Sequence, residues 1–376
     1  MRRSLLLLYI LLLSGCGGRA DFRDVAELQP IQTLGYDRSG GIVTLSASTG
    51  AGPEELPAAV LRGSGRSIGE ALDALRRYSE SEDLLFAHIR FVLVGEEAAR
   101  QGIGELLDWF ERLPQTRLDV PLFIVEGGDA AALFDGSGED GYEITSELLS
   151  LQRNAERQGL TVLTTLGETA RALTSRGCAL CCALRAAKNG DHVPAAPETV
   201  APLAQGTALL RGKSLTTFAG ESVSRGLALL TIPTGGGSLL LPDGEGGSAT
   251  IELTQRRVGY RAVFLPDGRP ELTVELRCRG AVSEVNSALG ADVLLPVLDS
   301  AFSETVASDA AAALRFLRLS GADVLGMEAK FRRADAALCE GVSFPEDVRI
   351  LLRTEARAER SFDLSAAENL HGEASR

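Results

Sequence analysis

The sequence contains few of the side chains on which metal binding and acid–base chemistry usually depend. Only three histidines occur in 376 residues: His88, His192 and His371. The acidic residues are dispersed, and no two of them stand out as an acid–base couple. The single tryptophan, Trp109, lies beside Phe110 in a predicted helix, where we expect it to pack rather than to bind a ligand. These shortages give no clear active site, and we expect no catalytic residue, cofactor or metal.

Positive charge and long hydrophobic runs are also scarce. Lys and Arg total 38 against 51 Asp and Glu, so the net charge is −13. This balance argues against nucleic acid as a partner, because phosphate binding needs clustered cations. It also argues against electrostatic attraction to an anionic membrane. Beyond residue 15, no segment approaches the ~18 uninterrupted apolar residues typical of a membrane span. Any membrane attachment is therefore expected to be apolar.

The overall composition and length are typical of a folded protein of more than one domain. Hydrophobic residues make up 45% of the chain and charged residues 24%, which is too apolar for general disorder. At roughly 150 residues per domain, the length allows two or three domains, each with its own core.

The N-terminus has the pattern of a secretory signal. Arg2 and Arg3 precede an apolar run over residues 5–13. As a helix this run would cover only ~14 Å of a ~30 Å hydrocarbon core, so it is too short to span the bilayer. We expect residues 1–15 to be a signal peptide that is removed.

The run ends in Leu13-Ser14-Gly15-Cys16, which resembles the lipobox of bacterial lipoproteins. Small residues before the scissile bond fit the peptidase, and the Cys16 thiol would accept a diacylglyceryl group. Two acyl chains anchor stably at ~0.8 kcal/mol per buried CH₂, whereas one chain would be marginal. Cys16 is therefore the predicted lipidation site. The alternative is an ordinary signal peptide with a chance cysteine.

Five cysteines remain, an odd number that cannot pair completely within the chain. Three of them, Cys178, Cys181 and Cys182, form a C-x-x-C-C cluster that could be half of a zinc site. No second cysteine pair stands at ligand spacing, because Cys278 and Cys339 are isolated. The alternative is a buried strand that uses cysteine as a small hydrophobic residue.

The first half of the chain predicts a strand–helix–strand order. We expect two strands over 29–47, a Gly/Pro-rich connector over 49–65 and a helix from Ser67 to about residue 78. A buried strand over 84–94, a helix over 95–112 and a strand over 120–125 form a crossover unit. Two helices, over 142–157 and 167–174, precede the cysteine-bearing strand.

The second half predicts antiparallel structure and a long helix. Residues 207–218 are expected to form a strand pair, 220–230 a helix and 235–247 turns. Alternation over 258–264 and 272–278 around Pro266-Asp267-Gly268 indicates a hairpin with one wet face. A helix over about 298–319, broken at Ser320-Gly321, precedes a last strand over 348–356.

Together these elements predict an α+β, multi-domain fold with mixed and antiparallel sheets flanked by helices. After the signal peptide, we expect an N-terminal part over 16–188, a linker over 189–205, a C-terminal domain over 206–366 and a tail over 367–376. The linker prediction rests on three prolines between residues 189 and 202.

Two motifs resemble catalytic or nucleotide-binding patterns. Gly65-Arg66-Ser67-Ile68-Gly69 matches the G-x-S-x-G of serine hydrolases, which would need an acid and then His192 or His371. The alternative is a capping box, in which Ser67 and Glu70 satisfy each other's amides. Residues 206–214 resemble a phosphate loop but have five residues between the glycines instead of four, so a strand is favoured.

His88 lies in the strand predicted over 84–94, where it would share a face with Phe86 and Arg90. A lone histidine in such a place is usually a hydrogen-bonded structural residue. A ligand-binding or pH-sensing role is the alternative.

Several segments resemble the C subunit of spore germinant receptors, the Ger(x)C family of lipoproteins in endospore-forming bacteria. The similarity extends over nearly the whole mature chain. The segments that carry it are residues 19–24, Gln32-Thr33-Leu34-Gly35-Tyr36-Asp37, residues 65–71, 85–90 and 93–103, residues 213–215, 220–221 and 225–227, and Gly321-Ala322-Asp323-Val324-Leu325-Gly326. The family usually has Trp soon after the lipidated Cys, whereas Gly17 and Gly18 stand here.

The resemblance implies a non-enzymatic subunit that is lipid-anchored at the outer face of the spore inner membrane. It also implies assembly with two integral membrane subunits, of the A and B types, in a nutrient-sensing receptor. Two other functions stay open from the residues alone: a lipid-anchored esterase that uses Ser67, and a solute-binding lipoprotein.

Overall fold

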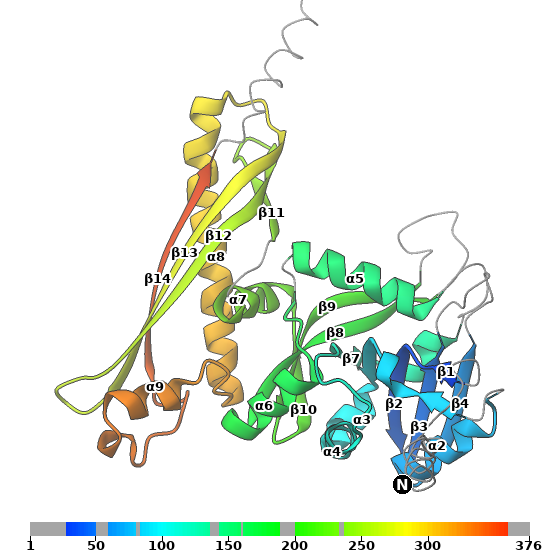
Figure 1. The fold of residues 1–376 in the computed structure, drawn as a ribbon. Helices are drawn as coiled ribbons and strands as arrows, with labels where there is room; N and C mark the ends of the chain where they lie inside the picture. The colour runs from blue at the N-terminus through cyan, green and yellow to red at the C-terminus, as the bar shows by residue number, and fades with distance from the viewer. Residues whose placement is uncertain are drawn as a thin grey trace, which may run out of the picture.

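The computed structural model describes residues 28–49, 59–79, 83–135, 143–158, 161–188, 200–232 and 237–359. They form an elongated α+β molecule with two main sheets, one in each half of the view in Figure 1. The multi-domain α+β class predicted from the sequence is confirmed. No helix within these ranges is both long and apolar enough to cross a bilayer.

The larger sheet has eight strands in the order β10-β9-β8-β7-β6-β2-β3-β4. Its strands are β2 (Thr33–Ser39), β3 (Ile42–Ser48), β4 (Val60–Gly65), β6 (Phe91–Val94), β7 (Leu122–Glu126), β8 (Cys178–Lys188), β9 (Val200–Arg211) and β10 (Ser214–Ala219). The central strands β2, β6, β7 and β8 are parallel, which confirms the crossover unit, and the outer strands pair antiparallel. Two further strands, β1 (Leu28–Pro30) and β5 (Asp83–Leu85), pair with each other in a small separate sheet.

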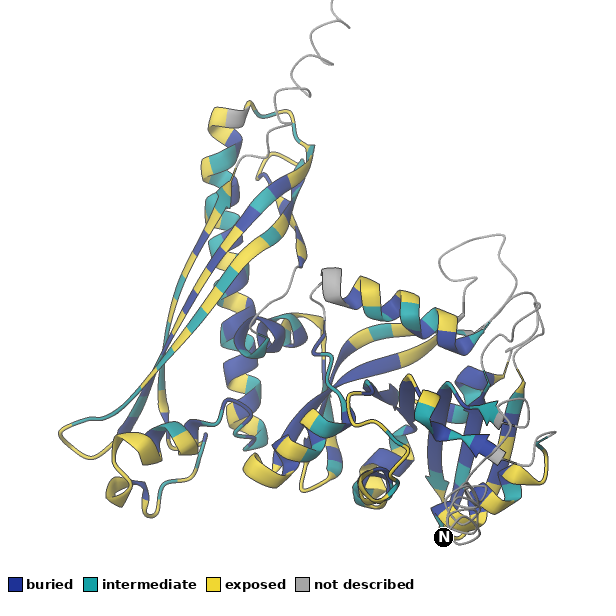
Figure 2. Cartoon of the chain, viewed as in Figure 1, coloured by how far each residue is buried: buried dark blue, intermediate teal, exposed yellow. Residues whose placement is uncertain are grey.

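Helices cover both faces of this large sheet. One face packs on α2 (Ile68–Arg76), α3 (Glu96–Gln101), α4 (Gly104–Arg112) and α6 (Leu166–Arg176). The other face packs on α5 (Ile144–Gln158) and the 3₁₀ turn η4 (Ala130–Phe134). The dark buried residues in Figure 2 follow the strands between these helical layers. Burial on both faces explains why β6 and β7 are apolar runs without alternation.

The second sheet has four strands in the order β11-β12-β13-β14. They are β11 (Ser238–Pro242), β12 (Ser248–Phe264), β13 (Pro270–Asn286) and β14 (Arg349–Glu359). The β12–β13 hairpin confirms the predicted antiparallel pair with one wet face. The 30-residue helix α8 (Ala291–Ser320) runs along this sheet, and α7 (Glu221–Thr231) and α9 (Met327–Ala334) pack nearby.

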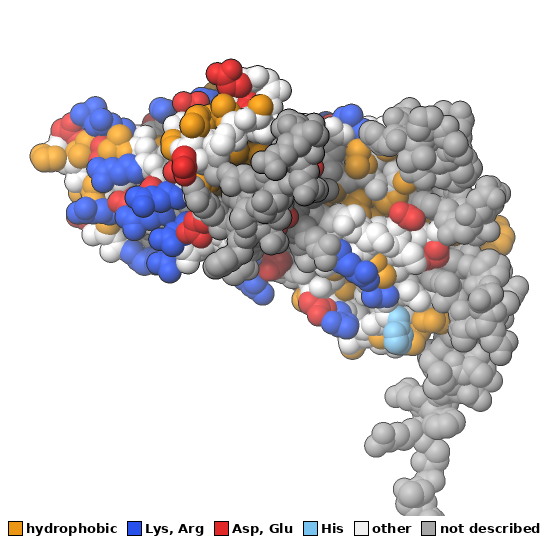
Figure 3. All heavy atoms as spheres, turned by 90° about the horizontal axis from the view of Figure 1, so that it is seen from above, with side chains coloured by type: hydrophobic (Ala, Val, Ile, Leu, Met, Phe, Trp, Pro, Cys, Tyr) orange, Lys and Arg blue, Asp and Glu red, His pale blue; other side chains and the backbone are white. Residues whose placement is uncertain are grey.

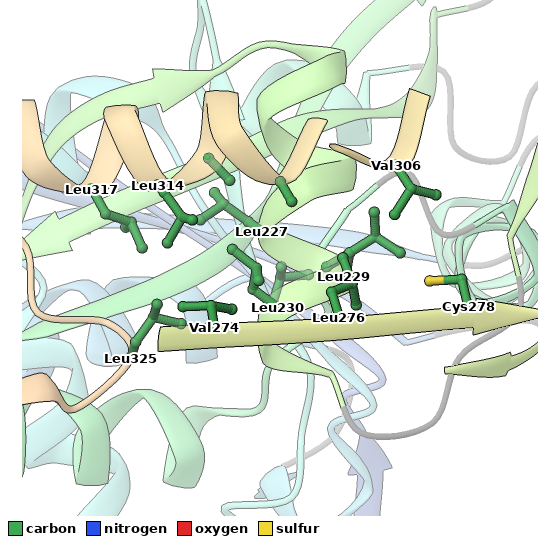
Figure 4. Close-up of a cluster of buried hydrophobic side chains, with 14 of the residues drawn as sticks. Leu227, Leu229, Leu230, Val274, Leu276, Cys278, Val306, Leu314, Leu317 and Leu325 are labelled. Carbon is green, nitrogen blue, oxygen red and sulfur yellow. The ribbon is translucent and has the colours of Figure 1, made fainter. Parts of the chain in front are cut away.

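A single hydrophobic cluster joins the two sheets. Figure 4 shows leucines of α7, among them Leu227 and Leu230, between α8 and the strand β13. The same buried cluster includes Leu180 of β8 and Leu209 of β9 in the large sheet. The two halves therefore share a continuous core, which burial at ~25 cal/mol per Å² of apolar surface stabilises.

Several sequence-based boundaries are wrong. The strand expected over 84–94 is interrupted by the 3₁₀ turn η3 (Phe86–His88). Here the backbone N–H of Arg90 donates to the carbonyl of Gln32 at 2.7 Å, which turns the chain from the small sheet into the large one. The helix expected over 95–112 is two helices, because Gly102 has a φ of 120°. The Ile103 N–H then donates to the Lys213 carbonyl at 2.9 Å instead of continuing the helix.

Strands also occupy segments that were expected to be loops. The connector expected over 49–65 ends in β4, which pairs with β3, and the turn-rich segment 235–247 contains β11. The linker expected over 189–205 is strand from Val200 onward, because Val200 pairs with Lys188 of β8. The boundary expected at residue 206 therefore falls inside β9. Each of these strands is stabilised by hydrogen bonds to a neighbouring strand, which its own sequence pattern does not reveal.

Candidate functional site

The segments Gly35-Tyr36-Asp37 and Gly95, which carry part of the family resemblance, meet at the end of β2. The Asp37 carboxylate accepts hydrogen bonds from the backbone N–H groups of Ala130 and Ala131, at 2.7 and 2.8 Å. Gly95 precedes α3, and a Cβ atom there would lie 2.1 Å from Asp37 Oδ1. Asp37 therefore holds the 3₁₀ turn η4 against the sheet by hydrogen bonds. The close approach of its carboxylate favours glycine at position 95.

Asp37 is only 6% exposed. Burial raises the pKa of its carboxyl from 3.8 to about 6, although the two backbone N–H groups act in the opposite direction. A buried acid with a shifted pKa is a candidate for function. Its oxygens, however, both accept from η4, so the arrangement serves packing rather than substrate contact.

In the second half, residues of the resembling segments join α7 to α8. Arg225 Nε donates to Asp309 Oδ2 at 2.8 Å, and the Asp309 side chain is 4% exposed. A Cβ at Gly226 would lie 2.0 Å from the Asp309 carbonyl oxygen, so only glycine permits this close crossing. Arg225 also pairs with Glu221 at 2.6 Å. The sequence did not reveal Asp309, because it lies within an otherwise ordinary long helix.

The Asp-x-x-Gly segment ends one helix and begins the next. Gly321 closes α8 with a φ of 60°. The Asp323 carboxylate accepts from the amides of Met327 and Glu328 at 2.6 and 2.9 Å, which caps α9. The predicted helix break is thus confirmed, with αL glycine as its physical cause.

A hollow of about 480 Å³ lies between the two halves of the molecule. One wall comes from α6 and β8, and the other from α7, Tyr260 of β12 and the segment before α9. Its lining mixes apolar side chains with Arg171 and Arg176. The Tyr260 hydroxyl donates to the Leu230 carbonyl at 2.6 Å and so ties β12 to α7 at this place. Its volume and mixed lining make this hollow a candidate site for a small solute.

Ser67 caps α2. Its hydroxyl accepts from the Glu70 amide at 3.2 Å, as the capping interpretation expects. The returning contact differs in detail, because the Glu70 carboxylate accepts from the Arg66 amide at 2.9 Å. A strand, β4, does precede Ser67, but it lies at the edge of the sheet, antiparallel to β3. The two histidines considered as triad partners, His192 and His371, lie outside the described residues.

His88 is exposed in the 3₁₀ turn, not on the expected strand face beside Phe86 and Arg90. It lines a shallow hollow of about 450 Å³ together with Arg90 and Arg117. Trp109 packs edge-on against Phe86, with ring centroids 5.6 Å apart, which confirms its packing role.

The three clustered cysteines point into three different hydrophobic clusters. Cys178 belongs to the cluster around α7, Cys181 to that beneath α6, and Cys182 to that beneath α5. Burial raises the pKa of Cys181 to about 11 and that of Cys182 to about 12. These thiols behave as small hydrophobic residues and do not converge on a common point. Cys278 and Cys339 are likewise buried free thiols.

The segment that resembles a phosphate loop is a hairpin. Residues up to Arg211 belong to β9, and β10 begins at Ser214. Gly212 and Lys213 form the turn with φ of 56° and 78°. The predicted strand pair is confirmed. The predicted lipidation site Cys16 and the signal peptide over 1–15 lie outside the described residues.

The comparisons with known proteins agree with this architecture. Residues 21–186 match the spore germination protein N-terminal domain, and residues 205–343 match the spore germination B3/GerAC like C-terminal domain. These matches define a two-part spore germination protein. The chain belongs to the GerAC-like family, the C subunits of spore germinant receptors.

A solved structure supports the same fold. The crystal structure of the GerBC protein is similar, with a TM-score of 0.51 and 15% sequence identity. The match covers 86% of this chain and 96% of that chain. No curated protein sequence matches at a significant level.

Proposed function

We propose that this chain is the lipid-anchored, non-enzymatic C subunit of a nutrient germinant receptor. The observation that carries the proposal is the pair of family matches in order along the chain. The first match begins at residue 21, five positions after Cys16 of the lipobox-like segment. Membership in this family implies a multi-subunit receptor associated with the spore membrane. We infer that its partners are two integral membrane subunits, of the A and B types.

The physical role of the anchor is confinement. Two acyl chains on Cys16 would hold the folded part at the membrane surface. Confinement raises the effective concentration of the chain for the membrane subunits, so modest contacts can maintain the complex. The subunit would support assembly and signalling without any reaction of its own.

Replacement of the acceptor thiol tests this proposal. Cys16→Ala should release the protein from the spore membrane fraction and impair nutrient-triggered germination. Ser14→Ala is the matched control, because it keeps a small residue before the cleavage site. Normal germination with a fully released Cys16→Ala protein would contradict the proposal. So would mass spectrometry of native protein that shows an unmodified Cys16.

Solute binding is a second candidate function, and the hollow between α6 and α7 favours it. Its volume of about 480 Å³ suits a small molecule, and elements of both halves line it. Thermal-shift screening with amino acids and sugars tests this function. A ligand at 100 times its dissociation constant should add about 2.7 kcal/mol of stability.

A further inference from the structure

One face of the sheet β12–β14 carries an unusual density of arginine. The helices α7, α8 and α9 pack on the other face, where Leu272, Val274 and Leu276 of β13 are buried. The outward-pointing positions of the three strands form what we call the outer face. Its arginines are all exposed: Arg257, Arg261, Arg277, Arg279, Arg349, Arg353 and Arg357. Figure 3 shows Lys and Arg side chains gathered at the left end of the molecule, where this sheet lies in Figure 1.

In two places the strand register puts arginines directly opposite each other. Arg257 of β12 faces Arg277 of β13, and in the next row Arg279 of β13 faces Arg357 of β14. Like charges at opposed positions destabilise a sheet. These two rows therefore oppose folding locally, whereas other rows of β13 and β14 pair Arg with Glu. A fold that retains such a local conflict usually does so for function.

A hollow of about 310 Å³ opens among these side chains. We call it the arginine hollow; its charged lining consists of Arg257, Arg277, Arg279, Arg357 and the single carboxylate of Glu355. Glu355 contacts Arg357 at 2.9 Å but lies 3.8 Å from Arg277 Nε. Outside the hollow, Arg279 contacts Glu359 at 3.3 Å, and Arg277 lies 3.9 Å from Glu275. Three carboxylates offer about twelve acceptor sites to the about twenty donors of four guanidinium groups. Many of the donors therefore face solvent.

The chemistry favours carboxylates as the ligand. The planar guanidinium group matches a carboxylate in bidentate fashion, which Lys cannot do. Phosphate would offer the same fit, but glutamates stand among the arginines of the outer face, including Glu275 and Glu355. A uniformly anionic lipid surface would be repelled by these glutamates and by the net charge of −13. A protein segment can instead place its carboxylates against the arginine rows alone.

We propose that the outer face docks an acidic segment of a partner protein, whose carboxylates enter the arginine hollow. The partner's identity as another receptor subunit rests on the proposed function, whereas the chemistry of docking does not. Binding by the purified chain and germination of spores are therefore separate measurements. If the proposed function fails, the chain still binds an acidic peptide. If the docking inference fails, peptide binding fails while Cys16→Ala still impairs germination.

Peptide binding by the full chain tests the docking chemistry. We use the Cys16→Ser chain, which lacks the acceptor thiol, with a fluorescent decapeptide of alternating Glu and Ser at low salt. The double variant Arg257→Glu/Arg279→Glu should weaken binding by about tenfold or more. Arg315→Glu/Arg318→Glu is the matched control, because both residues are exposed on α8. The control variant should bind the peptide as tightly as the chain with an unsubstituted outer face.

Stability separates docking from a structural role. Because Arg257 stands opposite Arg277, Arg257→Thr relieves their repulsion, so it should raise the urea midpoint of unfolding while it weakens peptide binding. A lower midpoint would mean that the arginines serve the fold and would overturn the proposal. Equal peptide binding by the outer-face and control variants would overturn it as well. So would phosphatidylglycerol vesicles that bind through these arginines when the peptide does not.

A photocrosslinking residue at position 255 tests docking in spores, since Gln255 lines the arginine hollow. We expect an adduct with a partner segment rich in Asp and Glu, and no such adduct from position 315. Arg279→Glu should abolish the adduct, and reversal of the partner's carboxylates to Arg should restore it. An adduct with a segment that lacks carboxylates, or failure of the charge swap, would overturn the proposal.

Discussion

A single buried carboxylate, that of Asp37, connects the sequence motif to the stability of the N-terminal half. Its two hydrogen bonds to η4 hold that turn on the sheet. Burial nevertheless raises the pKa of Asp37 to about 6, so ionisation is costlier in the folded state than in the unfolded chain. The folded protein therefore binds a proton at this site over a range in which the unfolded chain has released it.

This linkage predicts a measurable pH dependence. The contribution of Asp37 to stability is fully present below pH ~4 and is lost as pH rises towards 6. Two pKa units correspond to about 2–3 kcal/mol. The side chain of the Asp37→Asn variant cannot ionise. The unfolding free energy of the variant should therefore rise relative to that of wild type between pH 4 and pH 7.

Urea unfolding at several pH values measures this difference. Asp73→Asn is the control, because the Asp73 side chain is 67% exposed on α2. The control should change little with pH relative to wild type. A pH-independent difference for Asp37→Asn would show that the burial of Asp37 does not raise its pKa.

At the scale of elements, the crossing of α7 and α8 joins the two sheets. The Arg225–Asp309 pair is part-buried at this crossing. Removing one member of a buried pair leaves the other charge without compensation, which typically costs ~3–5 kcal/mol. Arg225 keeps its contact with Glu221, so we expect Asp309→Ala to cost about 3 kcal/mol.

Gly226→Ala tests the same crossing of α7 and α8 through steric packing, because it changes no charge. The added methyl group would meet the Asp309 carbonyl, so the helices must separate. We expect a loss of at least ~1–3 kcal/mol, although alanine is the better helix former. Glu304→Ala on the exposed side of α8 is the control and should lie within ±0.5 kcal/mol of wild type. Equal urea midpoints of unfolding for Asp309→Ala, Gly226→Ala and Glu304→Ala would contradict this account.

The elements predicted well from sequence are those stabilised by their own pattern. Alternation in β12 and β13 correctly gave the hairpin, and apolar spacing gave α7 and most of α8. The failures have long-range causes. The turn at η3 depends on Gln32, and the break between α3 and α4 depends on the Lys213 carbonyl. Neither partner lies within a local window of sequence.

The same limit applies to the candidate sites. The Gly35-to-Asp37 segment and the glycines of the helix break were recognisable as motifs, and the structure gives each a packing role. The wet face of the hairpin was predicted, and Arg277 and Arg279 lie on it. The arginine hollow was not, because it also needs Arg357 of β14, whose parallel pairing with β13 no local pattern reveals.

At the scale of the whole molecule, the two family segments form one body. The hydrophobic cluster that includes Leu180 and Leu209 extends through α7 and α8 to Phe331 of α9. The sheet that carries the outer face is therefore connected to the large sheet through packed side chains. Eleven residues lie between Cys16 and the first described strand, so the anchor can lie at most ~40 Å from it.

If the anchor acts by confinement alone, its chemistry should be replaceable. We predict that an uncleaved transmembrane helix of ~20 apolar residues, placed before a Cys16→Ala chain, restores much of the nutrient response lost in Cys16→Ala. The reason is that a helix holds the folded part at the same surface and within a similar reach. A matched helix interrupted by two Asp residues should fail to insert and fail to restore germination. Germination rate and membrane fractionation are measured on the same spores, so each variant reports both position and response. A membrane-bound chain that leaves germination impaired would show that the acyl chains contribute contacts of their own, beyond the effective concentration they provide.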